Sequence, residues 1–430
     1  MNIYDYQQAF QAADKTSKAM KNAIAEWFDT YYGKGENQQD PCQRLGYTIV
    51  NKLLRAVFGE YQTYIDDKAA LQALRALEDR KKEALQLALV GGECYIKPYV
   101  TAEGFGFTLI PRDHILIFGR DGSGNVTDMG TAQQVTKGNE YFTLLERRRL
   151  NEQGFLVLEN RLYRSKNAER LGDPVPLTAV EAFAALPETY IFPVSLGGVG
   201  VVGMKTPMLN CVDGSQEGVC VYGAAMDLIR RVDENEKQLR EEFKRGESRV
   251  IASADLLDSN GGLTDHLFVG LDEDPETVGI TVYSPELRAD AYILRKREYL
   301  RNVESVVGLR RGMLSEVNNE ERTAAEITSS AGDFNLTVIE FQQMWEKALH
   351  QVLRLCGLLA PLYGLPALRQ TEPVVDWGNS TLYDEDKLWQ DYRQMVLDGL
   401  IAPEVALGWR FNMPAGTEEE RKKIREMYMP

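Results

Sequence analysis

Apolar residues in the first 90 positions recur at the spacing of helices, and the pattern then changes to that of strands. Helices are predicted for residues 3–33, 41–61 and 66–90. Strand patterns follow at 93–100, 105–119, 141–150 and 154–165. In each, apolar residues form a run or alternate with polar ones, and turns with Gly and Asp separate the strands. We therefore expect a helix-then-sheet α+β unit that ends near residue 195.

A long helix with little apolar surface is predicted next. Asp213 and Ser215 can cap its start, Glu217 lies in its first turn, and Gly246 follows its end. This gives about 28 residues, or about 42 Å. Its apolar stripe, after Ala225, consists of Leu228, Ile229, Val232 and Leu239. The other positions are mostly charged, so burial in a core of its own cannot hold this helix.

A second helix of the same kind is predicted for residues 285–308, starting at Ser284, Pro285 and Glu286. Its narrow stripe comprises Tyr292, Tyr299, Leu300, Val303 and Val307. The two helices can bury these stripes on each other, but their remaining sides stay charged.

Charge is segregated along this part of the chain. The module between the helices has three short strand-like pieces, and residues 246–286 contain nine acids and one base. Residues 287–311 contain seven bases and three acids. The simplest interpretation is a solvated helical hairpin with a polar tip.

The best apolar stripe follows a short polar loop at 309–320. It predicts a helix over 322–359 with Phe334, Val338, Phe341, Trp345, Leu349, Val352, Leu355 and Leu359 on one face. A kink or break costs least near Ser329, Ser330 and Gly332. The chain then closes with helical patterns on either side of a turn at 412–416.

Composition narrows the possible functions. No window approaches the roughly 18 to 20 apolar residues of a membrane span, and the first residues do not resemble a signal peptide, so we expect a soluble, unexported protein. Five cysteines and three histidines lie far apart, which argues against a metal site or a disulfide framework. The formal net charge of −15 argues against gripping nucleic acid over the whole surface.

No motif supports catalysis. The run GGVGVVGMKT, residues 197–206, has glycines in dinucleotide-loop order, but Pro207 interrupts the helix that should follow, and Met204 breaks up a phosphate loop. The run DGSGNVTD, residues 121–128, lacks the glycine and glutamate of a calcium loop and favours a hairpin turn. We expect no catalytic residue, cofactor or metal.

Five runs, in this order along the chain, resemble the portal proteins of tailed bacteriophages, in particular the siphophage group. They are PCQRLGYTIVNKL, VDGSQEGVCVYGAAMDLIRRVDE, ERTAAEITSS, VDWGNSTLYDED and MVLDGLIAPE. The resemblance covers nearly the whole chain. It implies a subunit of a ring, usually of twelve copies, at one vertex of the capsid, through which double-stranded DNA passes.

The resemblance also divides the chain. It implies a wing at 1–212, stem helices at 213–246 and 285–308, a clip at 247–284, a tunnel loop at 309–320, a tunnel helix at 321–365 and a crown at 366–430. The tunnel-loop residues nearest the DNA would be Arg310, Arg311, Met313, Leu314, Asn318 and Asn319. The clip residues expected to dock a partner are Asp272, Glu273, Asp274 and Glu276. The residues expected to pack the stem are Leu228, Ile229, Val232, Leu239, Tyr299, Leu300 and Val303.

The implied partners are further copies of the chain, DNA, the large terminase subunit, a head–tail adaptor protein, and the major capsid and scaffolding proteins, with no membrane. The implied location is the virion, after assembly in the host cytoplasm. Two other classes stay open from the residues. A monomeric adaptor could bind a partner through the charged hairpin, and a ring-shaped nucleic-acid motor would fit a channel but needs the missing phosphate loop.

Overall fold

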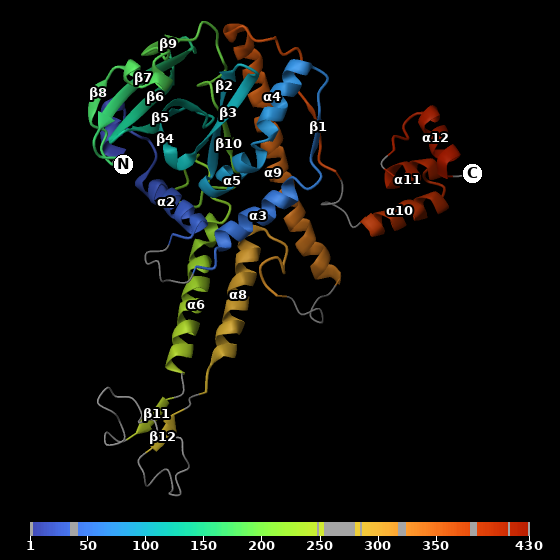
Figure 1. The fold of residues 1–430 in the computed structure, drawn as a ribbon. Coiled ribbons are helices and arrows are strands. Elements are labelled where there is room, and N and C mark those ends of the chain that lie inside the picture. The colour runs from blue at the N-terminus through green and yellow to red at the C-terminus, as the bar shows by residue number, and fades with distance from the viewer. Residues whose placement is uncertain are drawn as a thin grey trace.

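The computed structural model describes residues 3–34, 42–246, 249–252, 280–283, 286–316, 324–378, 385–411 and 413–428. A body of helices and sheets carries a projecting pair of long helices, and three C-terminal helices lie to one side (Figure 1). The predicted α+β class is confirmed.

Most of the described residues up to residue 91 are helical. The helices are α1 (Ile3–Phe10), α2 (Lys18–Tyr32), α3 (Leu45–Val57), α4 (Lys68–Glu78) and α5 (Lys81–Gly91). The single helix expected over 3–33 is wrong, because the chain turns at Gln11, where φ is 54°. The hydroxyl of Ser17 then accepts the Met20 N–H and caps α2.

Two larger antiparallel sheets also belong to the body. The smaller has the order β10 (Val202–Lys205), β2 (Glu93–Thr101), β3 (Gly104–Pro111). The larger has the order β4 (Ile115–Arg120), β5 (Val126–Lys137), β6 (Glu140–Leu150), β7 (Leu156–Ser165), β8 (Asp173–Val175), with β9 (Thr189–Ile191) also on β7.

Both faces of the larger sheet are covered. Phe142 and Leu144 of β6 pack against Phe183 and its neighbours in a short helical segment. On the opposite face, Leu145 packs with Phe10 of α1. The expected hairpin turn at 121–128 is confirmed, since the Asp121 carboxylate accepts the N–H groups of the turn between β4 and β5. The expected glycine-rich connector is only partly right, because its second half is strand β10.

The longest helix, α9 (Ala324–Leu359), runs across the body. Its predicted apolar stripe is confirmed as buried throughout, and Val338, Phe341, Trp345 and Leu349 are fully buried. The helix passes Ser329 and Gly332 without a break.

Residues 374–378 join the body rather than the C-terminal helices. Strand β13 (Val374–Asp376) pairs with β1 (Gln62–Tyr64), and Trp377 packs on Phe58 and Tyr61. The boundary expected at residue 366 therefore lies too early. The separate C-terminal helices are α10 (Glu385–Leu397), α11 (Pro403–Arg410) and α12 (Glu418–Tyr428).

The projecting helices are α6 (Met226–Arg245) and α8 (Ala289–Val307), followed beyond their ends by the strand pair β11 (Arg249–Ala252) and β12 (Ile280–Tyr283) (Figure 1). Helix α6 starts 13 residues later than the expected 213, so the predicted start is wrong. Helix α8 starts at Ala289, and Ser284 and Pro285 lie outside the described residues.

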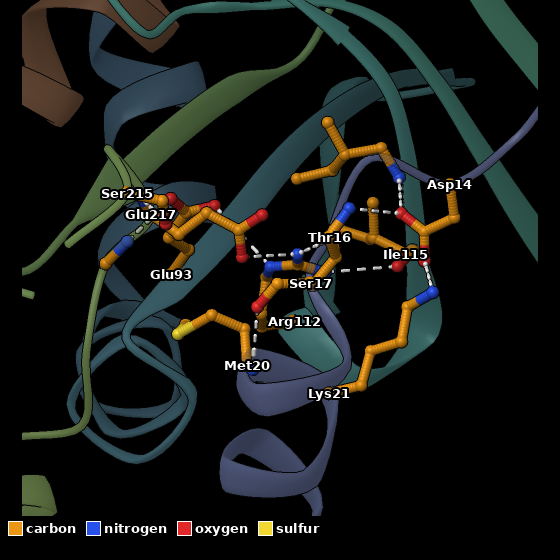
Figure 2. A network of polar contacts seen from close by, with 12 residues as sticks. Asp14, Thr16, Ser17, Met20, Lys21, Glu93, Arg112, Ile115, Ser215 and Glu217 are labelled. Atoms are coloured by element: carbon orange, nitrogen blue, oxygen red, sulfur yellow. Dashed lines mark hydrogen bonds and ion pairs between the residues drawn. The ribbon is translucent and has the colours of Figure 1, made fainter. Parts of the chain in front are cut away.

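Buried polar contacts explain why residues 213–222 are not helical. The guanidinium of Arg112 binds the Glu217 carboxylate at 2.9 Å and donates to the Thr16 hydroxyl at 2.6 Å (Figure 2). The carboxylate of Glu93 accepts the Gly218 N–H at 2.9 Å. These bonds hold residues 213–222 against the body. A helix over the same residues could not make them. Glu217 is thus a buried partner of Arg112 and not a residue of a helix's first turn.

Candidate functional site: the helical hairpin and its loop

Helices α6 and α8 pack side by side and antiparallel, and we call the pair the hairpin. Salt bridges join Glu236 to Lys296 at 3.0 Å and Glu242 to Arg288 at 2.9 Å, so the numbering rises on one helix as it falls on the other. The hydrogen bond from Arg288 lowers the pKa of Glu242. The Arg288 side chain of this pair is 73% exposed. Pairs as exposed as this one contribute little stability, although they fix the register of the two helices.

The fully buried apolar residues of the two helices lie in the half nearest the body. Ile229, Val232 and Val303 are buried, as is Val307. The other residues expected to pack the stem, Leu228, Leu239, Tyr299 and Leu300, are half-buried. The structure therefore brings both predicted stripes together, but only their body-proximal parts are fully covered.

The middle of the hairpin is held by a buried amide. Asn235 is 1% exposed, donates from Nδ2 to the Tyr292 carbonyl at 3.1 Å, and accepts from the Arg295 Nε at 2.7 Å. The same guanidinium donates to the Gln238 Oε1 at 2.6 Å. A buried amide with its donor and acceptor satisfied specifies one register for two helices that share little apolar surface.

Apolar side chains also remain on the outside of the hairpin. Ile293, Leu294 and Val306 of α8 are 50%, 59% and 47% exposed, and Phe243 of α6 is 50% exposed. The single chain leaves these side chains in water. They suit a further protein surface better than solvent.

The loop that follows α8 is tied to that helix by one carboxylate. Glu304 is 1% exposed and accepts the Gly312 N–H at 3.1 Å, the Ser315 N–H at 2.8 Å, and the Ser315 hydroxyl at 2.9 Å, as well as the Leu314 N–H. Gly312 has a φ of 91°, a conformation open to glycine, and the N–H groups of residues 312, 314 and 315 converge on the carboxylate, while the Met313 N–H donates to the Arg310 carbonyl.

The predicted loop residues divide into three groups. Arg310 and Arg311 are exposed, whereas Met313 and Leu314 are half-buried and pack against the body's core. Asn318 and Asn319 lie outside the described residues, as do the four expected docking acids Asp272, Glu273, Asp274 and Glu276.

Sequence reasoning missed Glu304 and Asn235. One signal was present for Glu304, since an acid in the last turn of a helix opposes the helix dipole and needs a compensating partner. Asn235 lies between charged neighbours and has no distinguishing signal in the sequence.

Across the described parts of the chain, no group of three or more His, Cys, Asp and Glu side chains is placed to hold a metal ion. In the same residues, no helix combines the length and the apolar character needed to cross a bilayer.

No protein-family model matches the chain, and no curated protein matches it either. Among solved structures, the chain is similar to one described as "Neck of native GTA particle computed with C12 symmetry". The alignment has a TM-score of 0.49 and 10% identity, and it covers 94% of this chain and 98% of that chain. At this level the likeness assigns neither a family nor an activity.

Proposed function

We propose that this chain is the subunit of a phage portal, a ring at one capsid vertex through which double-stranded DNA is packaged and ejected. The observation that carries the proposal is the hairpin, which projects from the body with charged sides and exposed apolar residues such as Ile293 and Leu294. Copies arranged by rotation would cover these sides with the equivalent helices of their neighbours.

The loop supports a channel role. It starts at the body end of α8, exposes Arg310 and Arg311, and is held in shape by Glu304. In a ring with the hairpins packed around an axis, one copy of this loop per subunit would face the bore. Cationic side chains at a few points on a strongly acidic chain would contact phosphates without holding the duplex in place.

The partners follow from the same role. The module at the tip of the hairpin would dock the large terminase subunit during packaging and a head–tail adaptor protein afterwards. The body and C-terminal helices would contact the major capsid and scaffolding proteins. We place the assembled ring in the virion, and its subunits in the host cytoplasm before assembly.

We further propose that the ring is a passive conduit and not an enzyme. The residue nearest to a phosphate-loop lysine, Lys205, lies on strand β10, and its Nζ donates to the Gln216 carbonyl at 3.0 Å. Energy for DNA movement would come from the terminase. ATP turnover by the purified chain would favour a motor instead.

Native mass spectrometry of the full chain, with electron microscopy of the same sample, tests the proposal. We expect a closed ring near twelve times the 48.5 kDa subunit, with a bore wide enough for duplex DNA. A species of 48.5 kDa alone, at all concentrations and salts, would contradict the ring and favour the monomeric adaptor.

A further inference from the structure

The carboxylate of Glu304 occupies a site built from backbone. Three N–H groups, from Gly312, Leu314 and Ser315, and the Ser315 hydroxyl converge on its two oxygens. Such a concave set of N–H groups is an anion-binding nest, and here the anion belongs to the same chain.

The position of Glu304 is otherwise unfavourable. It lies in the last turn of α8, where the helix dipole opposes a negative charge, and it is 1% exposed. A buried carboxylate without hydrogen bonds would be strongly destabilising. Its four donors all come from residues 312–315, so the loop itself compensates for burying the charge.

The main chain of Glu304 also forms part of the end of helix α8. Its carbonyl accepts the N–H groups of Gly308 and Leu309, which ends the helix. Gly308 has a φ of 76°, and a Cβ there would come within 2.6 Å of the Thr337 Oγ1 on α9. The helix end, the loop and α9 therefore meet at one residue.

We infer that Glu304 is a positioning residue that fixes the conformation of loop 309–316 by filling its anion-binding nest. The nest folds the backbone toward the body, so that Met313 and Leu314 pack on the core while Arg310 and Arg311 stay on the outside. A neutral amide is a poorer acceptor here, because it lacks the charge and its NH2 group, in place of Oε2, would face the Gly312 N–H. We call the contact between Glu304 and residues 312–315 the latch. It forms within a single chain, and its importance for DNA rests on the proposed function.

Hydrogen exchange of the Gly312, Leu314 and Ser315 amides in the full-length protein tests the latch. In Glu304→Ala we expect these amides to exchange at least about tenfold faster than in the unchanged protein, since hydrogen bonds to a charged acceptor are among the stronger ones. Glu304→Gln is expected to show a smaller increase, since one oxygen can still accept the three N–H groups. Glu298→Ala is the matched control, because Glu298 lies on the same helix with its side chain 54% exposed, and we expect no change in the loop amides.

Chemical rescue distinguishes a role of the negative charge of Glu304 from a role of its volume alone. Acetate should fit the space left in Glu304→Ala and slow exchange of the three amides, whereas acetamide, of similar size but neutral, should not. Unchanged exchange in Glu304→Ala, or equal rescue by acetate and acetamide, would overturn the inference.

A second variant covers the case in which Glu304→Ala does not fold. Ser315→Ala removes one donor and leaves the carboxylate in place, so we expect a smaller increase, confined to residues 312–315. No increase there would count against the latch. Native mass spectrometry of the same variants measures ring assembly independently of hydrogen exchange. A monomeric chain whose loop amides are protected would contradict the proposed ring but not the latch.

Discussion

At the scale of single residues, several carboxylates are buried and each is matched by cationic or N–H donors. Glu93 is reached by Arg112 and Arg120, Glu146 by Lys97 and Arg148, and Glu304 by loop 312–315. Pairing of this kind makes the removal of one partner costly, because a buried charge is then left uncompensated.

Glu146 gives this arrangement a pH dependence. Burial alone would raise its pKa, but Arg148 at 2.7 Å and Lys97 at 3.0 Å outweigh burial and lower the pKa to about 2. A group whose pKa is depressed in the folded state stabilises above its unfolded pKa and loses that contribution as pH falls through the folded value. We therefore predict that stability falls between about pH 4.5 and pH 2 by on the order of 3 kcal/mol from this group.

Thermal unfolding of the protein and of Glu146→Gln, compared over that range, measures the effect. The variant should be less stable near neutral pH, and its stability should depend less on pH in the acidic range. Parallel pH profiles for the two proteins would show that Glu146 does not contribute. Glu159→Gln, on the same sheet but more exposed, is the control, and we expect it to change the profile little.

At the scale of elements, close backbone contact decides where α6 begins. The chain crosses the body at Gly92 and Gly218 with no room for side chains, since a Cβ on Gly218 would lie 2.2 Å from the Gly92 carbonyl oxygen. The residues before Met226 are thereby kept against the body, and the helix starts only where the chain leaves it.

We predict that Gly218→Ala destabilises the body strongly, by at least about 2 kcal/mol, because backbone on both sides would have to shift. Gly198→Ala is the matched control in the same connecting region, where a Cβ meets nothing within 4 Å. Denaturant unfolding of both variants provides the measurement. Equal denaturation midpoints for the two variants would mean that the backbone at Gly92 and Gly218 can move apart without loss of stability.

The elements with a clear period could be predicted from the sequence, and the contacts between distant segments could not. The stripe of α9 was correctly recognised, because it repeats at helical spacing over several turns. The stripes of the hairpin are buried only near the body. The start of α6 was missed, since Asp213 and Ser215 are good caps locally and only Arg112, far away in sequence, draws Glu217 out of a helix. Strand β5 was missed because its alternation is weak, and Glu304 because its partners are backbone groups, which a sequence does not display.

At the scale of the whole molecule, the exposed side of the hairpin is where a ring would have to close. Ile293 and Leu294 lie on the outer side of α8, and their exposure means that the single chain does not need them for its own fold. Charged substitutions at these two positions are therefore expected to affect assembly and not the fold of the chain.

We predict that Ile293→Asp combined with Leu294→Asp prevents ring formation while the chain stays folded, because the new charges would be buried between subunits. Ile191→Asp is the control, since Ile191 is 56% exposed on strand β9, at the edge of the body. Native mass and circular dichroism of both variants are the measurements. Rings of unchanged size from the double variant would exclude this side of α8 from the interface.

The pairing of β1 with β13 has a consequence for synthesis on the ribosome. Strand β1 leaves the ribosome early, but its partner strand and Trp345, which donates to the Tyr61 hydroxyl from 284 positions away, emerge only near the end of the chain. At bacterial or eukaryotic elongation rates the delay is on the order of tens of seconds. During that time the apolar faces of α3 and α4 lack the long helix that packs against them. A nascent chain of this protein is therefore expected to depend on chaperones until residue 376 has emerged, whereas helices α10 to α12 emerge after the last strand of the body.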